Sequence, residues 1–309
     1  MPFSSFAADA IVLNAAFQLT WMTIMYIINM ACTNGSMVDF GWPSGFTVMA
    51  VWYLMMGTGA WIHRAVLSSM YIVCGARFIM RGHLTQEDHR WNHWRNYWTT
   101  QGGFFGIKSV PINFFCFYHC QSLTNIFFMA VPLHVAATNP SPVLSAWEHI
   151  GIGVWIAGFV IENIADMQLT AWKAANRSRG GVMRDGLWRY SRHPNYFGEF
   201  CLWVAYAVMT LPEATPSQAV LLLLLPGVAY FYLVYFTGAW MAEQVSLKKR
   251  GDEYAKYQAE TSLFFPRQQG HHLDNFAWKW SFLGASIHEE HTHTPCLSPT
   301  PTHLFEFLV

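Results

Sequence analysis

Long apolar segments constrain this sequence more than any other feature. Seven stretches of mostly apolar residues follow one another, at 10–32, 46–63, 66–80, 112–137, 147–165, 197–212 and 217–240. A helix needs about 20 such residues to cross a bilayer. Only 12% of the residues are charged, whereas a soluble domain has about 25%. The sequence therefore predicts an all-α, polytopic membrane protein with about seven transmembrane helices.

Composition excludes several other classes. Aromatic residues make up 17% of the chain, which is far too many for a disordered protein. The formal net charge is zero, so binding to nucleic acid through bulk positive charge is excluded. The six cysteines are scattered along apolar runs and form neither a disulfide framework nor a zinc-binding pattern. We therefore expect no bound metal and no nucleic-acid partner.

Lysine and arginine residues are strongly segregated between the predicted loops. With seven spans, Arg64 lies on one side of the membrane, and sixteen of the 18 basic residues lie on the other. The basic side comprises residues 33–45, 81–111, 166–196 and everything after 240. The positive-inside rule places these loops and the C-terminus in the cytosol. The membrane would be that of the endoplasmic reticulum in a eukaryote, or the inner membrane in a bacterium.

The chain is expected to form a single membrane domain over residues 1–266. From Arg267 onward the composition changes, and residues 267–309 include six histidines among prolines and other small or polar residues. Such a biased segment is typical of a solvated tail. We therefore predict a partly ordered tail after the membrane domain.

Charged residues follow a helical spacing at the end of the fifth predicted span. Glu162, Asp166, Lys173 and Arg177 share one face of a continuous helix. An acid at membrane depth is costly unless it faces a polar cavity. This favours a functional site, although an exposed, salt-bridged face is the alternative. A cationic, glycine-containing loop follows directly.

The sixth predicted span begins with a proline at the membrane surface. Pro194 suits the first turn of a helix, where its missing N–H costs nothing. The free N–H groups of such a helix start favour an anion, and Arg192 and His193 flank it. One face of the helix then carries Asn195 and Glu199. This pattern predicts phosphate binding at the mouth of a site and amide or carboxylate chemistry below it.

These residues belong to motifs that resemble a known superfamily. The run GLWRYSRHPNYFGE, followed by a span and then ExxxLKKRGDEYAKYQAETSLFFP, is similar to the steroid 5-alpha reductases and sterol reductases. Further blocks resemble the DUF1295 branch in particular: Asp166-Met-Gln168 with Lys173, Gly75-Ala-Arg77 with Arg81 and Glu87-Asp88, and Asp39-Phe-Gly-Trp42 with Gly45-Phe46. The resemblance covers about residues 35–266.

The resemblance implies a seven-helix fold that binds NADPH from the cytosol and reduces a carbon–carbon double bond in a membrane lipid. It implies cofactor contacts at Asp166, Lys173, Asn195 and Glu199, with Arg192, His193 and Tyr196 in the same motif and with Arg177, Arg179 and Arg184 suited to the phosphates. In the steroid reductases a tyrosine three positions before the third-span arginine donates a proton. Here that position is Cys74. Tyr71 or Tyr118 could replace it, with Asp39 as the acid partner.

Two alternatives stay open. A lipid or prenyl methyltransferase that uses S-adenosylmethionine shares the RHPxYxG run, although its cofactor has no phosphates and would need fewer cations. A non-catalytic lipid-binding member of the fold would explain the missing tyrosine at Cys74. The sequence names neither the lipid nor the oligomeric state.

Overall fold

The computed structural model describes residues 3–81, 87–176, 180–236 and 238–268, and this part of the chain is helical without strands. The α-helices are α1 (Phe3–Cys32), α2 (Met37–Met56), α3 (Trp61–Arg81), α4 (His89–Thr100), α5 (Val110–Thr124), α6 (Ala130–Thr138), α7 (Ala146–Ala175), α8 (Pro194–Thr210), α9 (Pro216–Phe231), α10 (Ala239–Arg250) and α11 (Asp252–Glu260). Two π-helical segments, η2 (Asn125–Met129) and η5 (Tyr232–Phe236), extend α5 into α6 and lengthen α9.

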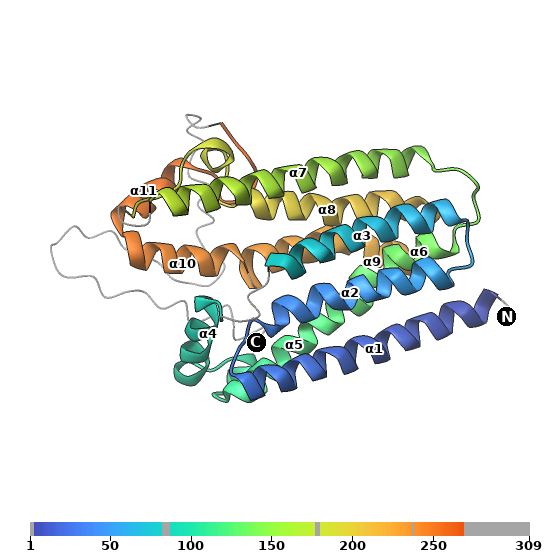
Figure 1. Ribbon diagram of the computed structural model, residues 1–309, viewed down its shortest axis with the longest axis horizontal. Coiled ribbons are helices and arrows are strands. Elements are labelled where there is room, and N and C mark those ends of the chain that lie inside the picture. Colours follow the sequence, from blue (N-terminus) through green and yellow to red (C-terminus); the bar gives the residue numbers. More distant parts are fainter. Residues whose placement is uncertain (1–2, 82–86, 177–179, 237, 269–309) are drawn as a thin grey trace.

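The long helices run alongside one another as a bundle (Figure 1). Four of them are long and apolar enough to cross a membrane, at Ala10–Cys32, Val110–Thr138, Ala146–Ala175 and Pro216–Phe236. Their outward-facing side chains are apolar, as Ile11, Leu13 and Leu223 illustrate. Such a surface is stable against hydrocarbon rather than water. The all-helical class and the membrane character are therefore confirmed.

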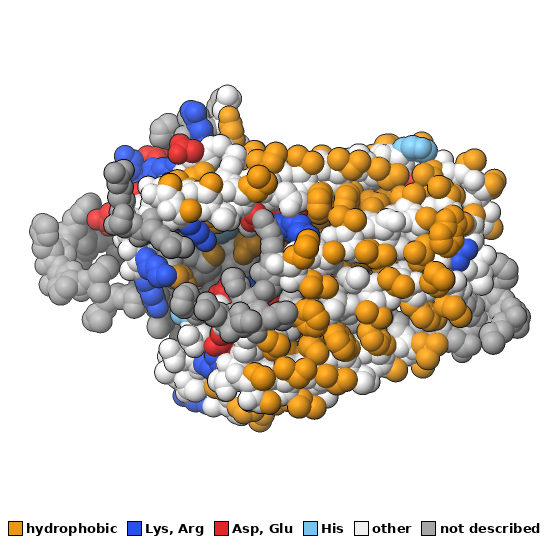
Figure 2. All heavy atoms as spheres, viewed as in Figure 1, with side chains coloured by type: hydrophobic (Ala, Val, Ile, Leu, Met, Phe, Trp, Pro, Cys, Tyr) orange, Lys and Arg blue, Asp and Glu red, His pale blue; other side chains and the backbone are white. Residues whose placement is uncertain are grey.

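Three short helices, α4, α10 and α11, gather at one end of the bundle. In Figure 1, α4, α10 and α11 lie at the end where α3 and α7 finish and α8 begins. Figure 2 shows most of the red and blue side chains at this end, whereas orange side chains cover the rest of the visible face. The opposite end holds short connections, at residues 57–60, 139–145 and 211–215. The polar chemistry of the described residues is thus concentrated at one end.

The predicted second span, 46–63, is wrong in its boundaries. Helix α2 covers Met37–Met56, and the turn lies at 57–60 rather than at 63–66. Gly59 and Ala60 donate backbone hydrogen bonds to Ala137 (2.8 Å) and Asn139 (2.7 Å). Because this turn bonds to the neighbouring helix end, its residues can be small and apolar, and hydropathy alone does not mark it.

Other expectations are met in part. Helix α7 continues beyond the predicted fifth span to Ala175, and Pro194 occupies the first turn of α8, as predicted. After α9, Gly251 (φ +53°) separates two short helices, α10 and α11. A glycine adopts this left-handed backbone readily and so ends the helix. Helix α4 lies inside what the sequence indicated as a loop.

Two glycines set the spacing of the helices that carry the site. A Cβ atom on Gly198 would lie 2.6 Å from the backbone nitrogen of Glu162, so only glycine lets α8 approach α7 this closely. A Cβ atom on Gly75 would lie 1.8 Å from Oγ1 of Thr47, between α3 and α2. The first of these contacts places Glu199 directly beside Glu162.

Candidate functional site

Arg77 of α3 is the centre of a buried polar cluster. Its side chain is only 7% exposed. Its Nη1 donates to Glu162, its Nη2 donates to Asp166 at 2.5 Å, and its Nε donates to Asn163 at 3.1 Å. These three partners come from one face of α7, over little more than one turn. Arg77 therefore ties α3 to α7 through charge-assisted hydrogen bonds, which are the strong ones.

The start of α8 completes this cluster. Nδ2 of Asn195 donates to Asp166 at 3.1 Å. Glu199 is buried one turn further, where the charges of Glu162 and Arg77 act on it and the indole of Trp203 lies within hydrogen-bonding reach. We call Arg77, Glu162, Asp166, Asn195 and Glu199 the carboxylate cluster. Sequence spacing predicted four of these five residues as parts of a site. For three of them, Asp166, Asn195 and Glu199, the family resemblance also implies a contact with the cofactor.

The carboxylate cluster is rich in carboxyl groups. It holds three carboxyl groups and one guanidinium group. Oδ1 of Asn195 is buried and has no hydrogen-bond partner among the described residues. Buried charges and buried polar atoms are costly unless they are compensated. The arrangement therefore suits a proton, or a ligand that donates hydrogen bonds or carries positive charge.

Aromatic hydroxyl groups lie next to the cluster, further into the bundle. The charges of Glu162, Glu199 and Arg77 act on the thiol of buried Cys74. The ring of Tyr206 stacks on that of Tyr71, with centroids 4.2 Å apart. The Tyr71 hydroxyl is buried and has no partner among the described residues, whereas that of Tyr206 accepts from Trp155 at 3.1 Å. Tyr71 is thus the candidate proton donor with a free hydroxyl.

The other candidate donor lies in a different part of the bundle. Tyr118 of α5 is buried, and its hydroxyl donates to the carbonyl oxygen of Gly35 at 3.3 Å. Asp39 pairs with Arg90 of α4 rather than bonding to either tyrosine. The charges of both Arg90 and Asp39 act on Tyr196, whose ring stacks on His193 at 5.4 Å. Asp39 and Tyr196 therefore belong to the polar end of the bundle.

Arg192 and His193 are engaged with α10. Nε and Nη2 of Arg192 donate to Glu243, at 2.6 and 3.2 Å, and Nη1 donates to two backbone carbonyls near the end of α11, those of Gln258 and Thr261. Nε2 of His193 lies 3.2 Å from the same carboxylate, and burial lowers the pKa of this histidine. These bonds hold the turn at residues 192–195 against α10 and α11, and we call them the clasp. A phosphate contact from Arg192 stays a prediction.

This clasp predicts an acid-sensitive stability. Burial alone would raise the pKa of Glu243, but hydrogen bonds from His193 and Arg192 and the charge of Arg192 outweigh it and lower the pKa to about 2 from 4.5. The stabilisation is therefore complete above the unfolded value and is lost as pH falls from about 4.5 towards 2. We expect the melting temperature to drop across this window. Glu243→Gln should lower it at pH 7 and flatten the acid dependence.

The matched control for this prediction is Glu260→Gln. Glu260 is 44% exposed and pairs with Arg184 at 3.1 Å, and exposed ion pairs contribute little. Equal pH profiles for wild type and Glu243→Gln would contradict the role of the clasp.

The remaining predicted phosphate contacts lie nearer the surface. Lys173 is exposed in the last turn of α7. Arg184 donates to Glu260 and, at 2.8 Å, to the carbonyl of Glu253. Arg177 and Arg179 lie outside the described residues. The structure therefore brings Lys173 to the end of the bundle that holds the cluster but leaves the phosphate assignments as predictions.

Sequence reasoning missed the central role of Arg77. The sequence shows Arg77 only as part of the Gly75-Ala-Arg77 block, and its partners follow it by 85 residues or more. The sequence did contain a signal for this pair. Arg77 and Glu162 each lie in an apolar segment, where a single charged residue is costly, so each needs a partner of opposite charge.

Comparisons with known proteins agree with the motifs. The model of the family described as "Protein of unknown function (DUF1295)" matches residues 25–261. The chain belongs to the DUF1295 family. A fission yeast relative, "Uncharacterized protein C594.04c" of Schizosaccharomyces pombe (strain 972 / ATCC 24843), is 23% identical over 279 residues, which cover 81% of this chain and 78% of the relative. No solved structure matches the chain.

Proposed function

We propose that this DUF1295 protein is an NADPH-dependent reductase of a carbon–carbon double bond in a membrane lipid. The observation that carries the proposal is the carboxylate cluster, with its buried acceptor on Asn195. A nicotinamide carboxamide offers two N–H donors, and the buried carboxylate of Glu199 and the Asn195 oxygen are acceptors of the matching kind. When bound, the cofactor would supply the hydride.

The residues of this chain have separate tasks in the proposed reaction. The Glu199 carboxylate and Asn195 of α8 orient the carboxamide. Arg77 fixes Asp166 of α7, which accepts from Asn195. The basic residues at the polar end bind the phosphates. Tyr71 holds the proton that completes the reduction, and the buried rings around it exclude water. Such positioning and proton transfer are the usual contributions of a protein to cofactor chemistry.

The buried carboxyl group of Glu199 also favours a second candidate function. S-adenosylmethionine carries a sulfonium and an ammonium group, and both would be stabilised by buried carboxylates. We keep a lipid methyltransferase as the alternative because of this charge. The cationic loop between α7 and α8 favours the dinucleotide, since each phosphate needs compensating charge.

A ligand comparison on the purified protein tests the two functions. NADPH, NADH and S-adenosylmethionine are added in turn, and the melting temperature is measured, because a ligand that binds only the folded state raises it. The reductase proposal expects the largest shift with NADPH. If only S-adenosylmethionine raised the melting temperature, the methyltransferase proposal would replace the reductase proposal.

The seven-span topology belongs to the same proposal. Helices α2, α3 and α8 would cross the membrane beside the four apolar spans, since they run parallel to them in the bundle (Figure 1). The polar end, with α4, α10 and α11, would then face the cytosol, where NADPH is available.

Tyr71→Phe should lower kcat by about 100-fold or more, the range usual for loss of a general acid. NADPH affinity should not change, because a group that acts only in the transition state does not alter ground-state binding. The matched control is Tyr118→Phe, since that hydroxyl already donates to Gly35. Steady-state kinetics with a lipid enone check both variants. If only Tyr118→Phe lost turnover, the proton donor would be Tyr118 of α5 and not Tyr71.

A further inference from the structure

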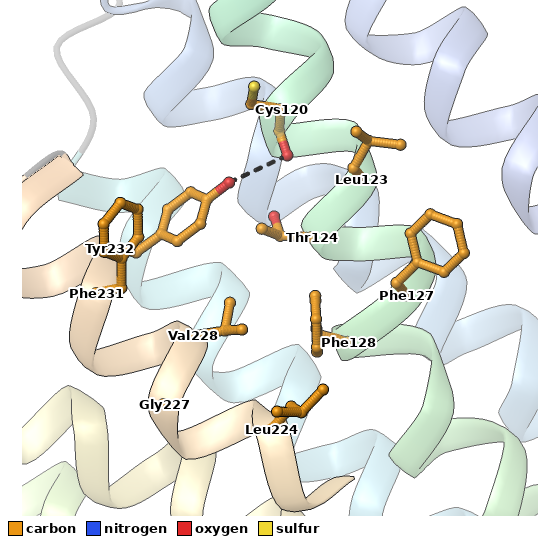
Figure 3. A pocket seen from close by; sticks show the side chains of 10 residues that line it. All are labelled: Cys120, Leu123, Thr124, Phe127, Phe128, Leu224, Gly227, Val228, Phe231 and Tyr232. Atoms are coloured by element: carbon orange, nitrogen blue, oxygen red, sulfur yellow. Dashed lines mark hydrogen bonds between the residues drawn. The ribbon is translucent and has the colours of Figure 1, made fainter. Parts of the chain in front are cut away.

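An apolar groove runs between α5–η2 and α9–η5. It has a volume of about 500 Å³, within the range of small-molecule sites. Its lining comprises Cys120, Leu123, Thr124, Phe127, Phe128, Leu224, Gly227, Val228, Phe231 and Tyr232. Figure 3 shows these residues on two facing helices. Both π-helical segments contribute to the walls, and π-helical segments are frequent at functional sites.

The few polar atoms of the groove are already satisfied. Oγ1 of Thr124 donates to Gln121 at 2.8 Å and accepts from the indole of Trp42 at 3.0 Å. The Tyr232 hydroxyl donates to the carbonyl oxygen of Cys120 at 3.4 Å, the bond dashed in Figure 3. A polar ligand would therefore lose its hydration without gaining partners from these groups. The lining suits hydrocarbon.

The groove opens where hydrocarbon would surround the protein. Its two walls belong to Val110–Thr138 and Pro216–Phe236, two of the four helices that are apolar and long enough to cross a membrane. Lining residues lie near the middle of both stretches, and Leu224 and Phe127 at the mouth are 53% and 49% exposed. Apolar side chains this exposed at membrane depth face acyl chains rather than water.

The inner wall of the groove leads to the carboxylate cluster. Trp42, which bonds to Thr124, stacks on Trp203 with ring centroids 5.9 Å apart. Trp203 in turn lies within hydrogen-bonding reach of Glu199. Two stacked rings thus separate the groove from the carboxylate of the proposed cofactor site.

We propose that this groove binds a hydrocarbon chain of the lipid on which the protein acts. The inference rests on the proposed function for the identity of that lipid as substrate. The chain lies along α9 beside Gly227, and the indole of Trp42 forms the boundary between it and the reacting end of the site. The groove then selects lipids by the shape and length of an apolar chain.

Gly227 offers a direct test of occupancy. A Cβ atom at this position would meet no other atom within 4 Å, so a larger side chain fits the fold and fills the groove. Replacing a glycine inside a helix also improves helix propensity. Gly153 of α7 is the matched control, because its Cβ position is equally open and it does not line the groove.

The experiment uses the full chain in nanodiscs that contain phosphatidylcholine with a diazirine on one acyl chain. After irradiation, labelled peptides are identified by mass spectrometry, without cofactor. We expect labelling in 120–128 and 224–232, reduced at least fivefold in Gly227→Leu and unchanged in Gly153→Leu. Wild-type labelling elsewhere only, or equal labelling in wild type and Gly227→Leu, would each overturn the proposal.

A parallel measurement separates this inference from the proposed function. NADPH affinity is measured on the same three proteins, and it should be equal in all of them, since the groove lies beyond the Trp42–Trp203 pair. If the groove is not labelled but NADPH still binds, only the proposal of lipid binding in the groove is overturned. Groove labelling without any NADPH binding overturns the reductase and, with it, the assignment of the bound lipid as its substrate.

Discussion

Replacing Arg77 by methionine should destabilise the protein by about 3–5 kcal/mol, the usual cost of removing one partner of a buried ion pair. Methionine keeps much of the length of the side chain but donates no hydrogen bond. Glu162 and Asp166 would lose the guanidinium, and Asn163 would lose its donor. Thermal unfolding of the purified protein measures the effect. Most of the variant should fail to accumulate in the membrane.

Arg184→Met is the matched control for this substitution. Arg184 is 29% exposed and its partner Glu260 is 44% exposed, so its removal should cost at most about 1 kcal/mol. A double variant, Arg77→Met with Glu162→Gln, should be less destabilised than the sum of the single changes, because the two residues share one hydrogen bond. Equal, small losses for Arg77→Met and Arg184→Met would show that the cluster does not stabilise the bundle.

The sequence predicted those parts of the fold that depend on local patterns. Apolar runs located each long helix, the spacing of Glu162 and Asp166 predicted one face of α7, and Pro194 marked the start of α8. The turn at 57–60 was missed because it is bonded to Ala137 and Asn139, which lie far along the chain. Helix α4 was missed because its sequence is mostly polar, although Trp91, Trp94 and Trp98 follow a helical spacing and form its buried face.

The candidate site also has one part that local sequence patterns predict and another part that they do not. Asp166, Asn195 and Glu199 were predicted from helical spacing, and the structure brings them together. The partners of basic residues were not predictable, because an arginine binds whichever carboxylate the fold brings to it. Arg192 meets Glu243, 51 residues away, and Arg77 meets α7. Long-range packing, which no local pattern encodes, decides such pairs.

Glu199→Gln should weaken NADPH binding about tenfold or more, the largest effect on the cofactor that we expect. A buried donor that loses its acceptor costs about 1–3 kcal/mol, and 1.4 kcal/mol is a factor of ten in affinity. Glutamine keeps the shape of the side chain and one acceptor oxygen, but its second terminal atom is an NH₂ group that cannot accept a hydrogen bond. The measurement is NADPH affinity by calorimetry, with the melting temperature of the cofactor-free protein recorded on the same sample.

The melting temperature separates a cofactor role from a structural one. The three nitrogen atoms of the Arg77 guanidinium group already donate to Glu162, Asp166 and Asn163. Glu199→Gln keeps those bonds and places an uncharged amide beside Glu162, so the cofactor-free protein should melt at the same or a higher temperature. Glu162→Gln is the contrasting variant and should melt lower, because it weakens the pair with Arg77. A lower melting temperature in Glu199→Gln with unchanged NADPH affinity would make Glu199 a structural partner of Arg77 and remove it from the cofactor site.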